Sequence, residues 1–511
     1  MRTINILRNG FYALLSFSLT AVLGIVVRKY FTIYLSVEFL GLEGLFSNIV
    51  MMLSLAELGI ASIISYNLYR ELSSKNEQEI NVLMSIYRYI YTTIGLFILL
   101  VGILLFFFLP YFVHDSSLPW SYVQFMYVIQ ICTVLTSYFL AYKRTLLVAD
   151  QKDYVCIRVD MCCNIISNIL RLFVIIYFQS YVLFSLLGLF FNVVANIIIV
   201  YRVKKEYPFV RKYKVSFSDI KERNLFRDVK NLLIQKGAGF IYGGADSIYL
   251  SSFLGIRITG LMANYQLIDR GVFSIMYKAL QGVVPSIGNL VYESNEVKTN
   301  KVFWSLDLLY LIMGSYLAVV YAIFFQPFMK LFFGESFLLH ESMLLIWALF
   351  VFLMVQFENL CNFRNTVGLF DKDRNYIVLS AIVKLTIGIP AIYLFGVTGL
   401  VFASLLGWLF IGYGRFMIVF NYVLKNQSKI KYLVRHLVWS LFEITIISLL
   451  YLLFYFWNYN NDFVELFISL IVIMLLLTVA NIIFFCGTAE FKYLLFYIKN
   501  TANALLGKGT I

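Results

Sequence analysis

Long, uninterrupted apolar segments are the feature that most constrains this chain. Residues 91–112 and 466–485 are mostly apolar from end to end. A helix needs about 20 apolar residues to span a bilayer, whose hydrocarbon core satisfies no backbone polar group. Continuous runs therefore predict helices, because the strands of a membrane β-barrel show short alternating patterns instead. With 61% apolar and 14% charged residues among 511, a soluble globular enzyme is excluded.

We therefore predict an all-α polytopic membrane protein with about fourteen transmembrane helices. The N-terminal sequence MRTINILRNG has no small-residue cleavage site after it, so the first apolar segment is interpreted as a retained span. The expected spans are residues 11–35, 44–66, 86–113, 120–142, 155–177, 181–201, 232–254, 259–287, 304–326, 341–362, 376–394, 398–420, 438–457 and 464–485.

The distribution of basic residues predicts the orientation of these spans. Of the 41 Lys and Arg residues, the predicted outer loops contain only Arg257 and Lys330. Because cytoplasmic loops are enriched in Lys and Arg, both termini are expected in the cytoplasm. The same asymmetry explains the net charge of +13, and no nucleic-acid partner is needed to account for it.

The longest hydrophilic segment divides the chain into two predicted lobes. We expect an N-lobe of six spans at 1–201, a basic cytoplasmic linker at 202–231, a C-lobe of six spans at 232–420, and two additional spans with a cytoplasmic tail at 421–511. The linker includes the sequence KKEYPFVRKYKVSF. An orientation signal with attraction to anionic lipid is favoured for it over a specific partner-binding role.

An internal repeat supports this division. FLGLEGLFSN (Phe39 to Asn48) and FLGIRITGLMAN (Phe253 to Asn264) share Phe-Leu-Gly, then Gly-Leu, then Asn three residues after the Leu. Each is expected at the first outward turn of its half. Six predicted spans separate the two copies, so the lobes are expected to have the same orientation, as in transporters built from parallel repeats with the substrate site between them.

Charged residues within predicted spans are candidates for function, because each costs about 2.5 to 3.5 kcal/mol at the bilayer centre. The two hairpins that the repeat marks contribute Arg28, Glu57, Asp246, Asp269, Arg270 and Lys278. On the eighth span, helical spacing places a polar stripe on one face. This stripe consists of Gln266, Arg270, Ser274, Tyr277 and Gln281, with Lys278 at its margin.

Two interpretations of these charges stay open. The stripe predicts either a water-filled cationic wall or a buried polar contact between the lobes. Glu57, Asp246 and Asp269 are candidates for ion pairs with Arg28 or Arg270, or for ion coupling, and Lys384 of the eleventh span is a candidate of the same kind.

The sequence predicts no cofactor and no metal site. It contains no Walker-type loop, HExxH motif or nucleophile elbow, so transport is expected to be secondary. His114, His340 and His436 form no metal-ligand spacing. The six cysteines lie in or beside apolar runs, where they are typical packing residues and predict no disulfide framework.

Several segments resemble one known family. The region from Asn9 through Arg28 to Ile64, followed by LYREL, is similar to the polysaccharide transporter family of the multidrug/oligosaccharidyl-lipid/polysaccharide exporter superfamily. TLLVADQKDYV (145–155), GADSIYLSSFLG (244–255) and NYQLI (264–268) resemble the same family. The resemblance extends to about Gly288 and, by topology, over the rest of the chain.

The resemblance implies a flippase of the bacterial cytoplasmic membrane. Such proteins carry undecaprenyl-pyrophosphate-linked oligosaccharide repeat units to the outer leaflet, through a cationic cavity between two six-helix lobes, for capsule, O-antigen or exopolysaccharide assembly. Arg28 matches a basic cavity position, and Arg270 and Lys278 fall in the corresponding eighth span, with Gln266 and Gln281 beside them. The implied partners are glycan polymerase and glycosyltransferases of the same pathway, with H⁺ or Na⁺ as coupling ion.

Two other functions are weighed against this one. A cation-coupled multidrug exporter would have an acidic or apolar pocket, which the basic stripe argues against. A membrane glycan polymerase or ligase would need catalytic groups in its outer loops. Those loops are short and offer few acidic candidates, namely Glu38, Glu43, Asp115, Glu335 and Asp462.

Overall fold

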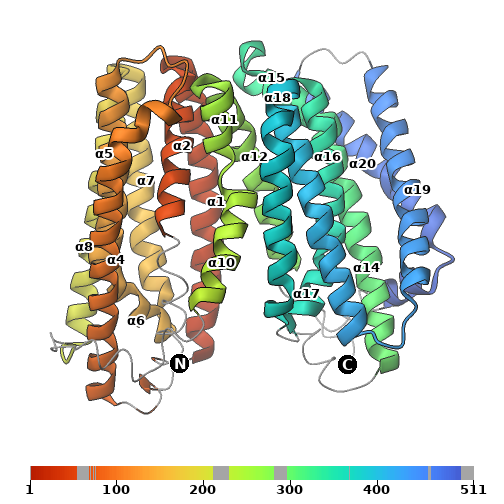
Figure 1. Ribbon diagram of the computed structural model, residues 1–511, viewed down its shortest axis with the longest axis horizontal. Helices are drawn as coiled ribbons and strands as arrows, with labels where there is room; N and C mark the ends of the chain where they lie inside the picture. Colours follow the sequence, from red (N-terminus) through yellow and green to blue (C-terminus); the bar gives the residue numbers. More distant parts are fainter. Residues whose placement is uncertain are drawn as a thin grey trace. The chain divides into compact units, whose positions relative to one another are not determined.

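The computed structural model describes residues 2–54, 68, 71–72, 74, 76–210, 229–280, 296–366, 369–457 and 462–496. All regular secondary structure in these ranges is helical (Figure 1). The helices in chain order are α1 (Arg2–Tyr34), α2 (Val37–Leu53), α4 (Glu77–Phe112), α5 (Trp120–Leu140), α6 (Arg144–Ala149), α7 (Asp153–Phe178), α8 (Tyr181–Glu206), α10 (Val229–Gly239), α11 (Asp246–Leu254), α12 (Ile256–Leu280), α14 (Glu296–Val319), α15 (Phe325–Phe333), α16 (Glu341–Gln356), α17 (Glu358–Thr366), α18 (Phe370–Tyr422), α19 (Lys429–Tyr455) and α20 (Phe463–Phe485).

The all-α membrane architecture is confirmed. Within the described residues, ten helices are long and apolar enough to cross a bilayer. One of them, α18, contains two predicted spans, because Gly396 breaks it with φ 58° and ψ −137°. Glycine adopts this conformation without the steric penalty that a side chain would bring, so the chain can turn sharply there. A described helix overlaps each predicted span, and the count of fourteen stays a prediction.

Two π-helical segments interrupt the α-helical path. The η3 segment (Phe240–Gly244) joins α10 to α11, and the η4 segment (Val320–Phe324) joins α14 to α15. A π-helical turn shifts the regular i to i−4 hydrogen bonding and occurs frequently at functional sites. The η3 segment directly precedes Asp246, the first residue of α11.

The described helices form two compact units. The N-terminal unit comprises residues 1–240 and 244–266, and the C-terminal unit comprises residues 241–243 and 267–511. The predicted lobe boundary was the basic segment 202–231, of which residues 211–228 lie outside the described residues. In the described structure, α11 and the first part of α12 group with the N-terminal unit, although they follow that segment in the sequence.

Pairwise helix packing builds the N-terminal unit. Helix α1 packs on α7, α7 on α8, and α5 on both α4 and α8. Helix α2 packs between α5 and α11. The buried side chains of these helices form one apolar core, which includes Phe46, Ile98 and Ile175. Large apolar side chains on the opposite faces, such as Phe107 of α4 at 70% exposure, form the continuous apolar exterior of a lipid-facing surface.

The two copies of the sequence repeat contact each other inside the N-terminal unit. Gly41 of the first copy lies on α2 and Gly260 of the second lies on α12. A methyl group on Gly41 would overlap the carbonyl oxygen of Ile256, and one on Gly260 would overlap that of Val37. These glycines are therefore required for the close approach of the two helix backbones.

The C-terminal unit has its own packed core. Helix α14 packs on α16 and α19, α16 packs on α18, and α19 packs on α20. Aromatic side chains fill the space between α14, α18 and α19, where Phe303, Phe420 and Tyr432 make edge and tilted ring contacts. The unit is therefore a packed helical bundle by itself.

Candidate functional site

Arg28 is held in the interior of the N-terminal unit. It lies on α1, its side chain is half-buried, and its Nη2 donates a hydrogen bond to the carbonyl oxygen of Ala263 on α12 at 3.1 Å. The guanidinium is thus in contact with a neighbouring helix. The contact joins the first and eighth predicted spans, which belong to the two hairpins that the sequence repeat marks.

Polar groups surround this contact on α12. Gln266 is half-buried and lies three residues after Ala263, on the same helical face. Asn264 is fully buried, and neither atom of its amide hydrogen-bonds to another side chain or backbone group within the described ranges. Buried amides normally have such partners, so Asn264 is a further polar candidate. The sequence analysis used it only as a marker of the repeat.

Asp246 occupies the first turn of α11, directly after the η3 segment, and is half-buried. The N-terminus of a helix stabilises a negative charge, since its free N–H groups and dipole face the carboxylate. The same carboxylate interacts electrostatically with Tyr249 one turn later. Glu57 and Gln281 lie outside the described residues, so their roles stay predictions.

In the C-terminal unit, α12 carries Asp269, Arg270 and Lys278. Asp269 accepts a hydrogen bond from the hydroxyl of Tyr321 in the η4 segment. Arg270 is exposed. The side chain of Lys278 is not described. Asp269 therefore has an identified neutral partner on a second helix, whereas its neighbour Arg270 has an accessible guanidinium.

Lys384 is almost fully buried, at 1% exposure, in α18. Its ammonium group donates to the carbonyl oxygen of Tyr242 in the η3 segment and lies 5.3 Å from the centre of the Tyr242 ring. The Tyr242 hydroxyl in turn donates to the carbonyl oxygen of Ser404 at 2.7 Å. Because a π-helical segment disturbs the regular backbone ladder, these contacts stabilise it. This connection was not apparent from the sequence.

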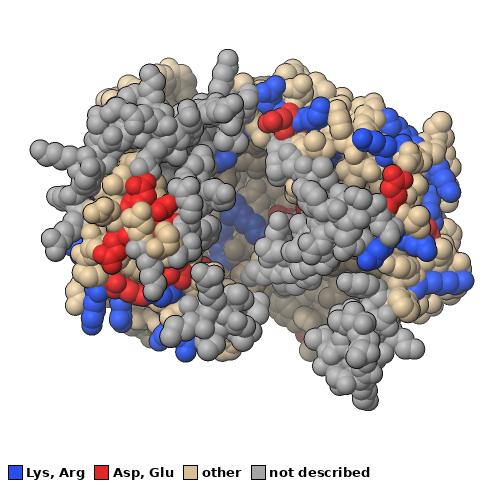
Figure 2. Space-filling view, turned by 90° about the horizontal axis from the view of Figure 1, so that it is seen from below, with Lys and Arg blue, Asp and Glu red and all other residues tan. Residues whose placement is uncertain are grey.

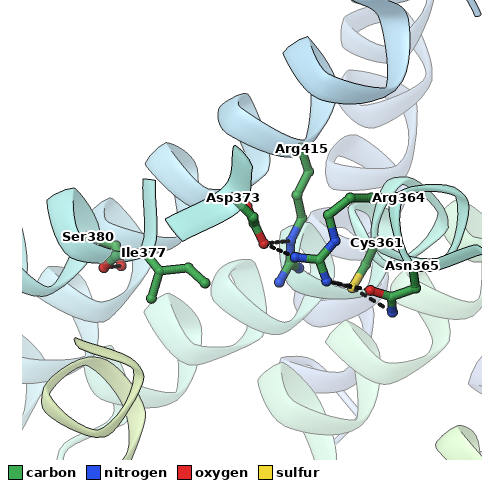
Figure 3. Close-up of polar contacts among 7 residues, drawn as sticks. All are labelled: Cys361, Arg364, Asn365, Asp373, Ile377, Ser380 and Arg415. Carbon is green, nitrogen blue, oxygen red and sulfur yellow. Dashed lines mark hydrogen bonds and ion pairs between the residues drawn. The ribbon is translucent and has the colours of Figure 1, made fainter. Parts of the chain in front are cut away.

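Asp373 forms a buried ion-pair cluster with two arginines (Figure 3). Its carboxylate accepts from Nη1 of Arg364 on α17 and, at 3.4 Å, from Nε of Arg415 in the second half of α18. The side chain of Asp373 is 0% exposed. Arg364 also donates to Asn365 at 2.5 Å. The cluster joins α17 to both halves of α18 and is the most buried charge network that the described residues contain.

The sequence carries a signal for this cluster. Arg364 is followed eight and nine residues later by Lys372 and Asp373. In the first half of the chain, Arg144 is followed at the same spacing by Lys152 and Asp153. In the N-terminal unit, however, Arg144 pairs with Asp160 on α7. The two units thus share an arginine just before a helix that begins with acidic residues, and each arginine binds a carboxylate of that helix.

Further titratable groups are buried between α14 and α19. Asp307 accepts hydrogen bonds from the Tyr432 hydroxyl at 3.3 Å and from Asn359 at 3.4 Å, and His436 Nδ1 lies 3.6 Å from its other oxygen. Glu443, two turns further along α19, is 0% exposed. Within the described ranges, no group of three or more His, Cys, Asp and Glu side chains is arranged to hold a metal ion.

Three of the five acidic residues that could serve an enzyme have structural partners. Glu38 accepts from the backbone N–H and hydroxyl of Ser117, both at 2.8 Å, and from the Ser116 hydroxyl. Glu43 accepts from the Tyr181 hydroxyl at 3.1 Å. Glu335 pairs with Lys330 at 2.9 Å, and this ammonium group holds the pKa of the Glu335 carboxyl below its usual range.

A polar cavity lies within the N-terminal unit among α5, α7 and α8. It has a volume of about 320 Å³, and its lining includes Arg144, Asp160, Asn164, Arg171 and Asn192. Arg171 donates from Nε to the Phe184 carbonyl oxygen at 3.0 Å and lies over the Phe184 ring. The charged groups of this cavity are thus already engaged by protein partners.

Helices of this length and polarity define a multi-pass α-helical membrane protein. The sequence model described as "Polysaccharide biosynthesis protein" matches residues 6–292, which is more than half of the chain. The chain therefore belongs to this family. No protein with curated function matches the sequence.

Solved structures show the same fold. A structure titled "Lipid II flippase MurJ, inward closed conformation" matches with a TM-score of 0.65 and 15% identity, over 93% of this chain and 98% of that one. An inward-facing multidrug resistance MATE family transporter of the MOP superfamily matches with a TM-score of 0.58 and 11% identity, over 80% and 96%. The chain thus has the fold that these transporters share.

Proposed function

We propose that this protein is a flippase for undecaprenyl-pyrophosphate-linked oligosaccharide repeat units, used in capsule, O-antigen or exopolysaccharide assembly. The family description, which names polysaccharide biosynthesis, is the observation that carries the proposal. The fold, shared with a lipid II flippase, supports the same class of substrate. The proposed architecture has fourteen helices in two six-helix lobes, with two further helices at the C-terminus.

Physical chemistry explains why such a substrate needs a protein. Moving an ion into hydrocarbon costs on the order of 20 kcal/mol per charge in the idealised limit, so a pyrophosphate crosses unaided only slowly. Guanidinium groups bind phosphate oxygens bidentately. Arg28 and Arg270 are proposed to bind the pyrophosphate together with Lys278, while Gln266 and Gln281 provide neutral contacts to the glycan. The polyprenyl tail stays in the lipid.

The proposed orientation places both termini in the cytoplasm of a bacterium, in its inner membrane. Exposed Lys and Arg side chains are visible in both units on the face shown in Figure 2. In the N-terminal unit, α8 ends with the exposed pair Lys204 and Lys205. Basic residues at such helix ends support a cytoplasmic location.

Transport is proposed to proceed by alternating access and to be coupled to an H⁺ or Na⁺ gradient. Asp246, Glu57, Asp269 and Lys384 are the coupling candidates from the sequence. Asp246 is favoured among those described, because it follows a π-helical segment, where the backbone can adjust. Glycosyltransferases and a glycan polymerase of the same pathway are the proposed functional partners.

The test is complementation of a gene deletion with single variants. Arg28→Ala and Arg270→Ala should abolish surface glycan and cause the lipid-linked repeat unit to accumulate, while protein levels persist. Arg257→Ala is the matched control, because Arg257 is also an exposed arginine of α12 and lies in a predicted outer loop. Normal surface glycan with both Arg28→Ala and Arg270→Ala would contradict the proposed binding site.

A multidrug exporter is the second candidate, since the fold is shared with a MATE family transporter. It would leave glycan assembly intact in the deletion strain and would instead change resistance to cationic compounds. The same deletion strain therefore distinguishes the two functions.

A further inference from the structure

A groove lies on the N-terminal unit between α7 and α8, where α7 begins and α8 ends. It has a volume of about 470 Å³ and is lined by residues of only these two helices. Its polar lining includes Tyr154 and Arg158 of α7, with Arg202 and Glu206 of α8. Its apolar wall includes Val159 and Ile198.

The groove carries excess positive charge. Of the charged residues that line it, two are arginines and one is Glu206. Glu206 forms an ion pair with Lys152, which also pairs with Asp150, and Asp160 nearby on α7 is paired with Arg144. Arg158 and Arg202 are both exposed. Arg158 lies 5.3 Å from the centre of the Tyr12 ring, and neither arginine forms an ion pair with a carboxylate in the described part of the chain. Two guanidinium groups therefore line one groove, and its acidic residue is already paired.

The two arginines lie at similar distances from the ends of their helices. Arg158 follows the first residue of α7 by five positions and Arg202 precedes the last residue of α8 by four. At 1.5 Å per residue, each is about 6 to 8 Å from its helix end. Both guanidinium groups are therefore near helix ends, where basic side chains meet anionic lipid headgroups.

The surface of α7 beyond Arg158 is apolar. Ile169 and Phe173 follow Arg158 and Cys162 on the same face of this helix and are 53% and 49% exposed. These side chains are suited to acyl chains lying along the helix. A molecule that matches the whole surface has a phosphate at one end and hydrocarbon chains at the other.

We propose that this groove binds an anionic phospholipid of the cytoplasmic leaflet, with its phosphate between Arg158 and Arg202. Guanidinium groups hold phosphate oxygens bidentately, and basic pockets between helices on the cytoplasmic side are suited to anionic headgroups. The excess positive charge favours phosphatidylglycerol over zwitterionic phosphatidylcholine. The leaflet follows from the orientation proposed above, whereas the groove and its charge do not depend on the transported substrate.

The test measures lipid bound to the full-length protein by native mass spectrometry, with phosphatidylglycerol and phosphatidylcholine as probes. The wild type should retain phosphatidylglycerol preferentially. Arg158→Gln/Arg202→Gln should bind it roughly 30-fold more weakly, the factor that corresponds to about 1 kcal/mol for each arginine. Each single variant should bind it about fivefold more weakly, which keeps the test valid if the double variant does not fold.

The matched control is Lys204→Gln/Lys205→Gln. It removes the same charge from the same end of α8, and both lysines are exposed and lie outside the groove lining. The control should retain most of the phosphatidylglycerol binding. Equal losses in the two double variants would show general surface attraction and would overturn the proposal.

Competition with undecaprenyl phosphate separates a structural phospholipid from a transported lipid carrier. Phosphatidylglycerol should remain bound in the presence of an equal concentration of undecaprenyl phosphate. Complete displacement would assign the groove to the carrier lipid and would overturn the proposal. Because these measurements involve no translocation, their outcome is separate from that of the complementation test.

Discussion

Replacement of Asp373 by Asn is the sharpest test of the buried charge network in the C-terminal unit. The substitution keeps the size of the side chain and removes its negative charge. Arg364 and Arg415, whose side chains are only 7% and 11% exposed, then lose their shared carboxylate. Two positive charges then remain in a largely buried environment, where the Glu358 carboxyl interacts electrostatically with both.

The expected cost follows from this burial. Removing one partner of a buried pair typically costs about 3 to 5 kcal/mol, because the remaining charge is uncompensated. Here one carboxylate serves two arginines, and the Glu358 carboxyl offsets part of its loss, so a cost within that range is expected. With about 2 to 4 °C per kcal/mol for a unit of roughly this size, the melting temperature should fall by on the order of 10 °C or more.

The assay is thermal unfolding of the purified protein in detergent, followed by the loss of monodisperse protein on heating. Asp371→Asn is the matched control. Asp371 lies two residues earlier at the start of the same helix, and its side chain is exposed. Its substitution should change stability by less than about 0.5 kcal/mol.

A double variant tests the mechanism of destabilisation. If uncompensated charge is the cause, Asp373→Asn/Arg415→Gln should be more stable than the sum of the two single variants predicts. A melting temperature for Asp373→Asn within 2 °C of the Asp371→Asn control, a span of about 1 kcal/mol on the same scale, would refute the reasoning. Additive behaviour in the double variant would refute it equally.

Three further predictions concern other contacts. Gly260→Ala should lower stability by about 1 to 3 kcal/mol, because the added methyl group would overlap the Val37 carbonyl oxygen. Gly271 has open space around it, so Gly271→Ala should leave stability unchanged. Equal melting temperatures for the two variants would contradict the close backbone approach. Lys384→Met should destabilise the protein by about 1 to 3 kcal/mol, because the buried Tyr242 carbonyl loses a donor; unchanged thermal unfolding would argue against that role. Burial lowers the pKa of the Lys152 ammonium, but its hydrogen bonds to Asp150 and Glu206 outweigh this effect and raise the pKa above the usual 10.5. The stabilising contribution of Lys152 is therefore complete below pH 10.5 and is lost as pH rises through the higher folded pKa. The difference in melting temperature between the wild type and Lys152→Met should accordingly shrink at strongly alkaline pH. A difference that grows with pH would contradict the stabilising role of the charged ammonium group.

The membrane architecture was predictable because its cause is local. Each span is an apolar run, and a bilayer leaves the backbone little choice but a helix. The sequence analysis also named Arg28 as a candidate and grouped its span with that of α12 in the two hairpins that the repeat marks. The Arg28 to Ala263 hydrogen bond agrees with that pairing.

The contacts of single charges were not predictable, because they depend on which helices meet. Lys384 had no partner in the sequence around it, and its partner Tyr242 precedes it by 142 residues. The carboxylate that Arg415 binds is 42 residues away. Helical periodicity shows which side chains share a face, but not which distant helix that face contacts.

The repeat was interpreted only as a mark of symmetry between two halves. In the structure, its glycines Gly41 and Gly260 also form the contact between α2 and α12. The spacing of Gly within an apolar run could have suggested a close helix contact, although not the identity of the partner.

The most direct test of the proposed function measures which leaflet contains the lipid-linked repeat unit. In spheroplasts that lack the glycan polymerase, the unit would be labelled from outside with a membrane-impermeant reagent, and the labelled fraction compared among strains. Wild-type protein should give extensive labelling, Arg257→Ala the same, and Arg28→Ala only the level of the deletion strain. Equal labelling in the deletion and wild-type strains would contradict the central claim that this protein moves the lipid-linked glycan across the membrane.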